Sequence, residues 1–208
     1  MNKKIMIINI DMGNVGSVAH ALDYLGSEYS ISNNKTDLER SDGLIFPGVG
    51  AFSSAMENLK RFDLLHTLEE QVLVKKKPFF GICLGMQLLA QDSTEGGSHK
   101  GLGWIAGHVT VLQPEGSLCV PHVGWNNVKV DHNSSFFKQI DGNSHFYFDH
   151  SYHIECDEDV VVATCEYGGA CVTAIHKENI FATQFHPEKS QRNGLKVLRN
   201  FLNFVESN

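Results

Sequence analysis

The chain has 208 residues, a formal net charge of −7, 42% hydrophobic residues and 20% charged residues. A chain of this length and composition can bury a complete hydrophobic core without disulfides or metal ions. These values exclude a disordered, collagen-like or cysteine-stapled protein. The 17 lysine and arginine residues form no long run, which argues against nucleic acid as a main partner.

The five cysteines indicate a reducing compartment, because their number is odd and no two have CxxC spacing. The apolar run over 5–10 ends at Asp11 and is too short for the hydrophobic region of a signal peptide. No stretch reaches the roughly 20 apolar residues of a membrane-spanning helix. We therefore expect a cytoplasmic protein.

The first half of the chain alternates strands with helices. Short apolar runs predict strands over 5–10, 29–32, 43–46 and 78–82. Apolar residues at helical spacing predict helices over 15–25, 62–75 and 84–91. Gly26 is a typical stop for the first helix. This alternation favours a parallel sheet with helices on both faces.

The second half has a different pattern, with short strands separated by turn signals. The expected strands are 108–112, 127–130, 145–148, 160–165, 170–175 and 180–185, followed by a helix over 193–205. These strands should extend the same sheet or form a small flanking one. No linker or repeat interrupts the chain, so we predict a single α/β domain over 1–208 with an open, mostly parallel sheet and added antiparallel strands.

Cys83 carries the strongest chemical signal in the sequence. It lies in Gly81-Ile82-Cys83-Leu84-Gly85, between an apolar strand and a helix, which is a G-x-C-x-G form of the nucleophile elbow. A sharp strand-to-helix turn exposes the thiol, and the helix N-terminus favours the reactive thiolate. The alternative is a small buried hydrophobic residue at a strand end.

A nucleophilic cysteine needs a base, and the base needs an orienting group. Phe185-His186-Pro187-Glu188 follows an apolar strand, so His186 lies at the carboxyl end of a strand, as Cys83 does. Sites of open α/β sheets form at these ends. Glu188 is close enough in sequence to reach the imidazole. The alternative for His186 is an exposed loop histidine.

Both motifs, Gly81-Ile82-Cys83-Leu84-Gly85-Met86-Gln87 and Gln184-Phe185-His186-Pro187-Glu188, resemble those of the class I glutamine amidotransferases, and the resemblance extends over the whole chain. It implies a Cys83-His186-Glu188 triad that hydrolyses L-glutamine to glutamate and ammonia through a cysteinyl thioester.

The resemblance also implies further site residues. The oxyanion donors would be the backbone N–H of Leu84 and one from the Gly48-Val49-Gly50 loop, at Val49 or Gly50. The residues that hold glutamine would be Gly48, Gln87, Glu95, Ser151 and Tyr152. For Glu95 the alternative is a surface carboxylate in a polar loop.

Other segments resemble the glutaminase subunits of imidazole glycerol phosphate synthases, which serve histidine biosynthesis. They are 47–50, 101–104, 121–126, 146–152 and 186–190. The resemblance implies a heterodimer in which ammonia passes to a (β/α)8-barrel cyclase subunit. The partner interface would include Pro121, His122, Trp125, Asn126, Tyr147 and Lys189.

Several alternatives stay open. Asp149, before His150, departs from the family pattern, in which an apolar residue is commoner at this position. Gly101-Leu102-Gly103-Trp104-Ile105 and Asn14-Val15-Gly16-Ser17 resemble a paralogous branch that supplies ammonia for amino-sugar amidination in surface-polysaccharide synthesis. A non-catalytic docking protein and a different cysteine hydrolase are further alternatives.

No cofactor or metal site is expected. His150-x-x-His153 and Cys119-x-x-His122 each lack the second pair that a tetrahedral site needs. The cysteines other than Cys83 are interpreted as packing residues: Cys119, Cys156, Cys165 and Cys171.

Overall fold

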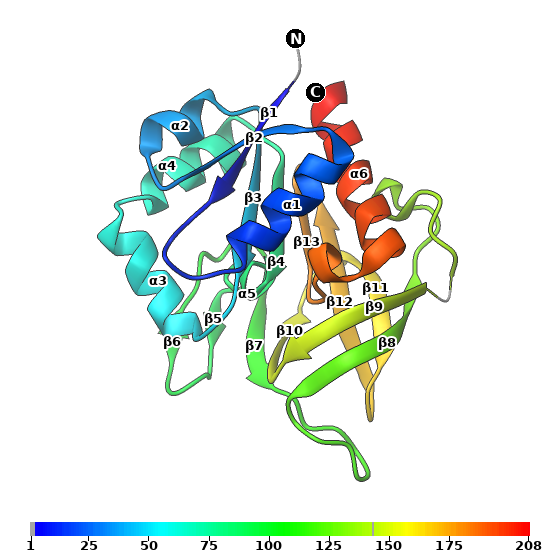
Figure 1. Ribbon diagram of the computed structural model, residues 1–208. Coiled ribbons are helices and arrows are strands. Elements are labelled where there is room, and N and C mark those ends of the chain that lie inside the picture. The colour runs from blue at the N-terminus through cyan, green and yellow to red at the C-terminus, as the bar shows by residue number, and fades with distance from the viewer. Residues whose placement is uncertain (1–2, 143) are drawn as a thin grey trace.

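A computed structural model describes residues 3–142 and 144–208 (Figure 1). Its large sheet has nine strands in the order β2-β1-β3-β4-β13-β12-β11-β8-β9. The first five are mutually parallel: β2 (Glu28–Ser32), β1 (Lys4–Ile8), β3 (Gly43–Gly48), β4 (Phe79–Cys83) and β13 (Ile180–Thr183).

Antiparallel strands complete this sheet: β12 (Ala170–Lys177), β11 (Val161–Glu166), β8 (His122–Val130) and β9 (Ser144–His150). A second sheet of four strands contains β10 (Tyr152–Cys156), β7 (Gly107–Val111), β5 (Asp92–Ser93) and β6 (His99–Lys100). The predicted α/β fold, with parallel strands first and antiparallel additions later, is confirmed.

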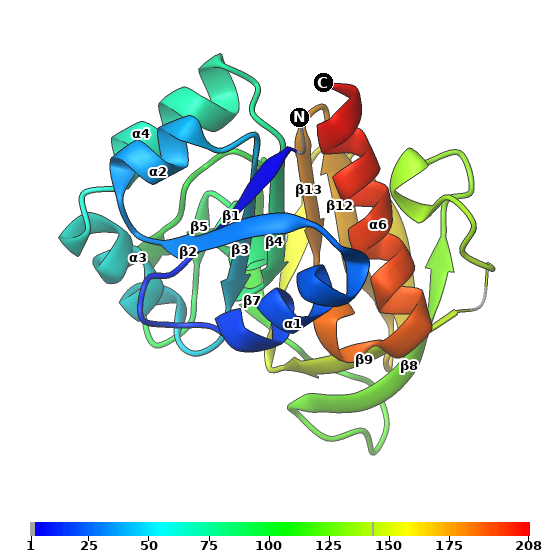
Figure 2. The same cartoon turned by 45° about the horizontal axis from the view of Figure 1, so that its top comes forward.

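Helices cover both faces of the parallel strands (Figures 1 and 2). On one face lie α1 (Val15–Leu25) and α6 (Gln191–Ser207), and on the other lie α2 (Lys35–Arg40), α3 (Phe52–Arg61) and α4 (Leu65–Glu69). The alternation of β1 explains this, because Ile5 and Ile7 join the first core whereas Met6 and Ile8 join the second.

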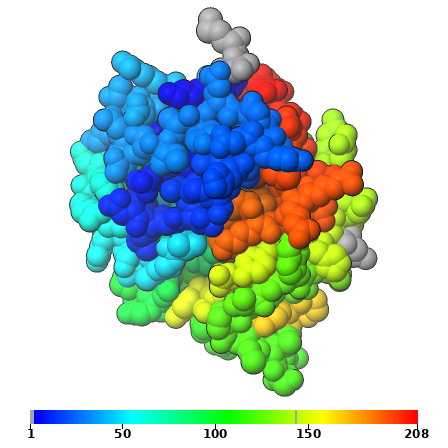
Figure 3. All heavy atoms as spheres, in the orientation of Figure 1, coloured from blue at the N-terminus to red at the C-terminus, as the bar shows by residue number. Residues whose placement is uncertain are grey.

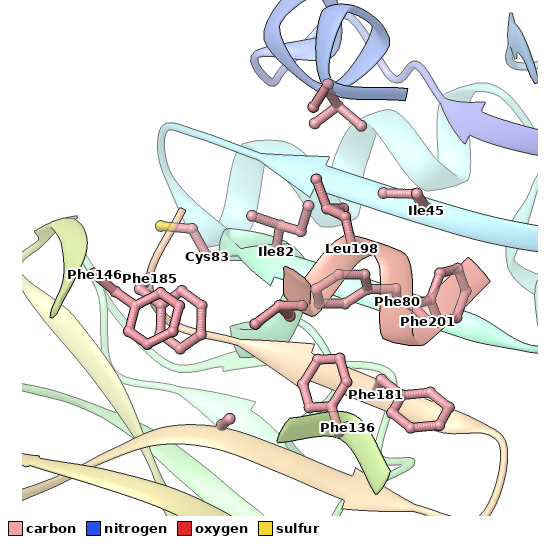
Figure 4. Packing of buried hydrophobic residues seen from close by; sticks show 14 of the residues in the cluster. Ile45, Phe80, Ile82, Cys83, Phe136, Phe146, Phe181, Phe185, Leu198 and Phe201 are labelled. Atoms are coloured by element: carbon pink, nitrogen blue, oxygen red, sulfur yellow. The ribbon is translucent and has the colours of Figure 1, made fainter. Parts of the chain in front are cut away.

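An aromatic cluster fills the core on the α6 side (Figure 4). The rings of Phe80 and Phe181 contact Phe136 of a short 3-10 helix (Ser135–Phe137), and Phe201 contacts both Phe80 and Phe181. The Phe80 and Phe136 ring centroids are 5.3 Å apart with an edge-to-face geometry, which aromatic pairs prefer. Cys83 lies at one end of the same core (Figure 4). The packed core therefore fixes the end of β4 that carries this residue.

The helix expected over 62–75 is only partly correct. The left-handed backbone of Asp63, with φ 54°, separates α3 from α4, and a π-helical turn (Glu70–Val74) follows α4 directly. Helix α3 was not predicted, although its buried residues have helical spacing: Phe52, Ala55, Met56 and Leu59. The residue before it, Ala51, has no polar side chain that could cap the helix, so the usual start signal in the local sequence is missing.

The helix expected over 84–91 is also too long, because α5 covers only Leu84–Gln87. The carbonyls of Leu88 and Leu89 accept hydrogen bonds from the N–H groups of Leu102 and Trp104. A distant segment thus captures the backbone groups that would have continued the helix.

Strand β8 begins at His122, five residues before the predicted strand over 127–130. Its pairing with β9, from His122 opposite His150 to Val128 opposite Ser144, extends it. The polar residues of this segment hide the apolar alternation that a strand prediction needs.

Cys165 and Cys171 are buried opposite each other on β11 and β12, as expected for packing residues. Cys119 is exposed, so its interpretation as a packing residue was wrong. It lies in the segment 112–121 between β7 and β8, which projects from the body of the molecule (Figures 1 and 3). Within residues 3–142 and 144–208, none of the helices has the length and apolar character to cross a bilayer.

Candidate active site

Cys83 is the last residue of β4, and α5 begins at the next residue. Its backbone has φ 54° and ψ −108°, a strained conformation for a residue with a side chain. A Cβ on Gly81 would lie 2.6 Å from the Gly85 carbonyl oxygen, so only glycine fits at this turn. The predicted nucleophile elbow is confirmed as a backbone geometry.

His186 follows β13 and is oriented by Glu188. The Nδ1–H of His186 donates to Glu188 Oε1 at 2.8 Å, and the two side chains are only 2% and 1% exposed. The backbone is also fixed, since the His186 N–H donates to Tyr147 and the Ser190 hydroxyl donates to the His186 carbonyl. The imidazole therefore has one orientation, set by a carboxylate.

Electrostatics favour a protonated His186. Burial lowers its pKa, but hydrogen bonding and charge from Cys83 and Glu188 outweigh burial and raise the pKa to about 10. The Nε2 atom of His186 is buried and makes no hydrogen bond of standard geometry within the described part of the chain. This nitrogen is therefore available to exchange a proton with Cys83 and a bound molecule.

The loop after β3 lies directly beside the elbow. Gly48 pairs in register with Cys83, and a Cβ on Gly48 would lie 2.7 Å from the Leu84 Cβ. The strand and the elbow can approach this closely because the side chain is missing. Gly50 has φ +104°, which glycine adopts without strain.

Most of the expected site residues surround one cavity of about 380 Å³. Seven of them line it together with Cys83: Val49, Gly50, Leu84, Gln87, Glu95, Ser151 and Tyr152. Pro121, Asp149 and His150 complete the lining. Gly48 lies behind the cavity, at the level of Cys83 in the sheet. Residues from five separate parts of the chain thus meet around one thiol.

Gln87 and Glu95 have fixed side chains. Gln87 is 5% exposed, and its Nε2 donates to the Tyr152 carbonyl at 2.8 Å and to Gln184 Oε1 at 3.1 Å. Glu95 Oε2 accepts the N–H of Phe52, the first residue of α3, at 2.8 Å. Glu95 is therefore not a free surface carboxylate, because it caps a helix and faces the cavity.

The residues expected at the partner interface differ in their exposure. Trp125 is 49% exposed, its ring meets Tyr147 edge-on, and the Lys189 ammonium lies over the Tyr147 ring at 5.4 Å. His122 is only 3% exposed, stacked between Phe148 and Tyr167. Its expected place on the interface was wrong, since the alternation of β8 directs it inward.

Known proteins share this sequence pattern and this fold. The family model for "Glutamine amidotransferase class-I" matches residues 6–204. The chain belongs to the class I glutamine amidotransferase family. A HisH 1 subunit of imidazole glycerol phosphate synthase from Campylobacter jejuni is 46% identical over 95% of this chain and 98% of its own length.

A second relative is similarly close in sequence, and a solved structure is similar in fold. A HisH 2 subunit from Vibrio vulnificus is 47% identical, over 98% of this chain and 95% of its own length. Among solved structures, PurLQS from Thermotoga maritima has a TM-score of 0.74, at 20% identity over 99% of this chain and 100% of that chain. The structural likeness supports the amidotransferase fold.

Sequence reasoning missed three groups of this amidotransferase site. The Gln184 amide donates to the Cys83 sulfur at 3.6 Å, and Asp149 and His150 line the cavity. The Cys83 thiol in turn lies 3.9 Å from the Asp149 carbonyl. Gln184 is the first residue of the His186 motif, which was the available signal, whereas only the fold brings β9 to Cys83. Within the described residues, no cluster of three metal-ligating side chains occurs.

Proposed function

We propose that this chain is the glutaminase subunit of an imidazole glycerol phosphate synthase and hydrolyses L-glutamine with Cys83, His186 and Glu188. The observation that carries the proposal is the buried His186–Glu188 pair, with a 2.8 Å contact, next to a cysteine on a strained elbow. Relatives named as HisH subunits, 42–47% identical over nearly the full chain, support the pathway.

The chemistry begins when the Cys83 sulfur attacks the side-chain carboxamide carbon of glutamine. His186 Nε2 already holds the proton of the Cys83 thiol, so the sulfur attacks as a thiolate. A C–S bond forms, and the carbonyl oxygen becomes an oxyanion. The backbone N–H of Leu84 and one from Val49 or Gly50 would stabilise this charge. All three residues line the cavity at Cys83, which supports the assignment.

Collapse of the tetrahedral intermediate breaks the C–N bond. His186 gives its proton to the departing nitrogen, ammonia leaves, and a thioester remains on Cys83. Water then attacks the thioester, glutamate is released and the thiol is restored. The raised pKa of His186 suits the acid role, since the imidazole holds its proton at neutral pH until the leaving group needs it.

Glutamine would fill the cavity of about 380 Å³. Glu95 would accept hydrogen bonds from the substrate α-amino group, while Gln87 and the backbone of Ser151 and Tyr152 form the opposite wall. Gly48 keeps the loop close to Cys83.

Ammonia would pass to a (β/α)8-barrel cyclase subunit in a heterodimer. An exposed apolar patch supports a docking face: Leu118, Val120, Val123 and Trp125 are 46%, 41%, 55% and 49% exposed. Aromatic residues in such patches contribute strongly to binding. Tyr147 adjoins Trp125, and Lys189 lies over the Tyr147 ring. Pro121 and Asn126 are on the same segment as Trp125.

The glutaminase proposal is tested by measuring glutamate release from the chain with its cyclase partner and the cyclase ligand present. Release that disappears in Cys83→Ala is expected. No release from the wild type, or release that survives Cys83→Ala, would refute it. Labelling of Cys83 by a glutamine-analogue electrophile, blocked by glutamine and not by peptides, separates this activity from that of another cysteine hydrolase.

A paralogous glutaminase that serves amino-sugar amidination is the second candidate. The observation in its favour is that two relatives carry copy numbers in their names, HisH 1 and HisH 2. Growth of a histidine auxotroph that lacks its own glutaminase subunit decides between the two. Rescue by the wild type but not by Cys83→Ala supports histidine synthesis.

A further inference from the structure

His122 and His150 form a buried pair that the proposed reaction does not use. His122 is 3% exposed and His150 is 6% exposed. His122 Nδ1 and His150 Nε2 are 3.1 Å apart. The pair continues on both sides: Asn126 Nδ2 lies 3.3 Å from His122 Nε2, and His150 Nδ1 lies 2.9 Å from the Tyr152 carbonyl.

The direction of every hydrogen bond in this chain of groups is determined by its two ends. At one end, Asn126 Oδ1 accepts the Asn127 N–H at 2.7 Å, so Asn126 Nδ2 must be the atom that donates to His122. His122 therefore accepts at Nε2 and donates at Nδ1. At the other end the Tyr152 carbonyl can only accept, so His150 donates at Nδ1 and accepts at Nε2.

Both histidines must be neutral in this arrangement. A second proton on either ring would set an N–H against another N–H donor. Burial acts in the same direction, lowering the pKa of His122 to about 4 and that of His150 to about 3. The titratable neighbours that act on His150 are His122, His153 and His186, and the rings of Phe148 and Tyr167 enclose His122.

The last acceptor belongs to the cavity wall. The Tyr152 carbonyl also receives the Gln87 amide, and the segment 149–152 lines the cavity beside Cys83. The first donor, Asn126, follows the exposed Trp125 on β8. A single row of hydrogen bonds thus connects the proposed docking face with the proposed glutamine pocket.

We propose that His122 and His150 are positioning residues, which hold the 149–152 wall of the glutamine pocket through a one-directional relay that begins at Asn126. The proposal rests on the proposed glutaminase function. A carboxylate at position 126 cannot donate to His122 Nε2. In Asn126→Asp, His122 must present an N–H at Nε2, and because the buried ring stays neutral its Nδ1 becomes an acceptor. The relay then reverses, and His150 no longer donates to Tyr152.

Two measurements test the relay on the full-length chain. Nitrogen-15 spectra of the histidine rings should show His122 and His150 as Nδ1–H tautomers that do not titrate between about pH 5 and 8. In the complex, with the partner saturating, Asn126→Asp should raise the KM for glutamine about tenfold, or about 1.4 kcal/mol. Its kcat should stay within about threefold, because the triad is untouched.

Asn127→Asp is the matched control, since it adds the same charge to an exposed neighbouring position of β8. It should leave both the tautomers and the KM unchanged. Nε2–H tautomers in the wild type, or equal tautomers and KM values in the two variants, would overturn the relay. If the wild-type complex releases no glutamate, the proposed function fails, while the nitrogen spectra still decide the relay.

Discussion

Two buried histidine sites lie near Cys83 and have opposite electrostatics. His186 is 2% exposed and His150 is 6% exposed, yet the pKa of His186 is raised to about 10 while that of His150 is lowered to about 3. A carboxylate and a thiol contact the first, whereas a neutral histidine and a carbonyl contact the second. Burial alone makes a histidine neutral, and a buried anion reverses that effect.

The two histidine sites also have different proposed roles, proton transfer for His186 and positioning of the cavity wall for His122 and His150. The protonated site lies at the ends of parallel strands β4 and β13, where a mobile proton can reach Cys83. The neutral site lies on the antiparallel strands β8 and β9, where two fixed tautomers hold the wall of the cavity.

The largest effect should come from removing the thiol beside His186. Cys83→Ala should reduce glutamate release by about 10⁴-fold or more, because the nucleophile has no substitute. The same change should lower the pKa of His186, since Cys83 is one of the groups that raise it. Glutamate release and histidine nitrogen shifts measure the two effects. An unchanged His186 pKa would show that Cys83 does not help to keep His186 protonated.

Removal of the carboxylate should have the next largest effect. Glu188→Gln keeps the shape of the side chain but removes the charge, so the pKa of His186 should fall and kcat should decrease by about 10²-fold. The kinetics should be measured in the complex, with Gln113→Glu as an exposed control. Full activity in Glu188→Gln would show that the carboxylate does not set the protonated state of His186.

The exposed side of the neutral site should matter for partner binding and not for His186. Trp125→Ala should weaken association with the cyclase partner by about 2 kcal/mol, or about thirtyfold. Calorimetric titration measures the dissociation constant. The His186 pKa should stay the same. Unchanged affinity would remove Trp125 from the docking face.

The smallest effect concerns stability and pH. Between pH 6.5 and 4 the unfolded chain protonates residue 122 and the folded chain does not, because the folded pKa is about 4. The free energy of unfolding therefore falls as the pH falls, by about 2 kcal/mol for this residue between pH 7 and 5. His122→Phe keeps a stacked ring but has no group to protonate. It should therefore remove the contribution of residue 122 to the pH dependence of the free energy of unfolding, as measured by urea unfolding.

His145, an exposed residue on β9, supplies the control for this measurement. His145→Gln should lose stability between pH 7 and 5 as the wild type does. A His122→Phe chain with the pH dependence of the wild type would mean that His122 is not neutral in the folded protein.

The sequence contained the protonated site but not the neutral one. Cys83 and His186 each follow an apolar strand, so parallel topology alone brings them to one edge of the sheet. The pairing of His122 with His150 depends on the register of β8 against β9, and no local pattern encodes it. For the same reason His122 was assigned to the surface, although the alternation of β8 turns its ring inward.

Local signals also explain which helices were predicted well. Helix α1 ends at Gly26 as expected, because this residue adopts a left-handed cap with φ 70°. Helix α5 ends early because residues 102 and 104 take the carbonyls of Leu88 and Leu89. That competition is a tertiary contact, which helical periodicity does not record.

The central claim is that Cys83 forms a thioester with glutamine beside a protonated His186. Mass spectrometry of the complex, quenched in acid during turnover, tests it most directly. We predict one glutamyl adduct, on the peptide that contains Cys83, and none in Cys83→Ala. Glutamate release without an adduct on Cys83, or an adduct on a different cysteine during turnover, would contradict the account.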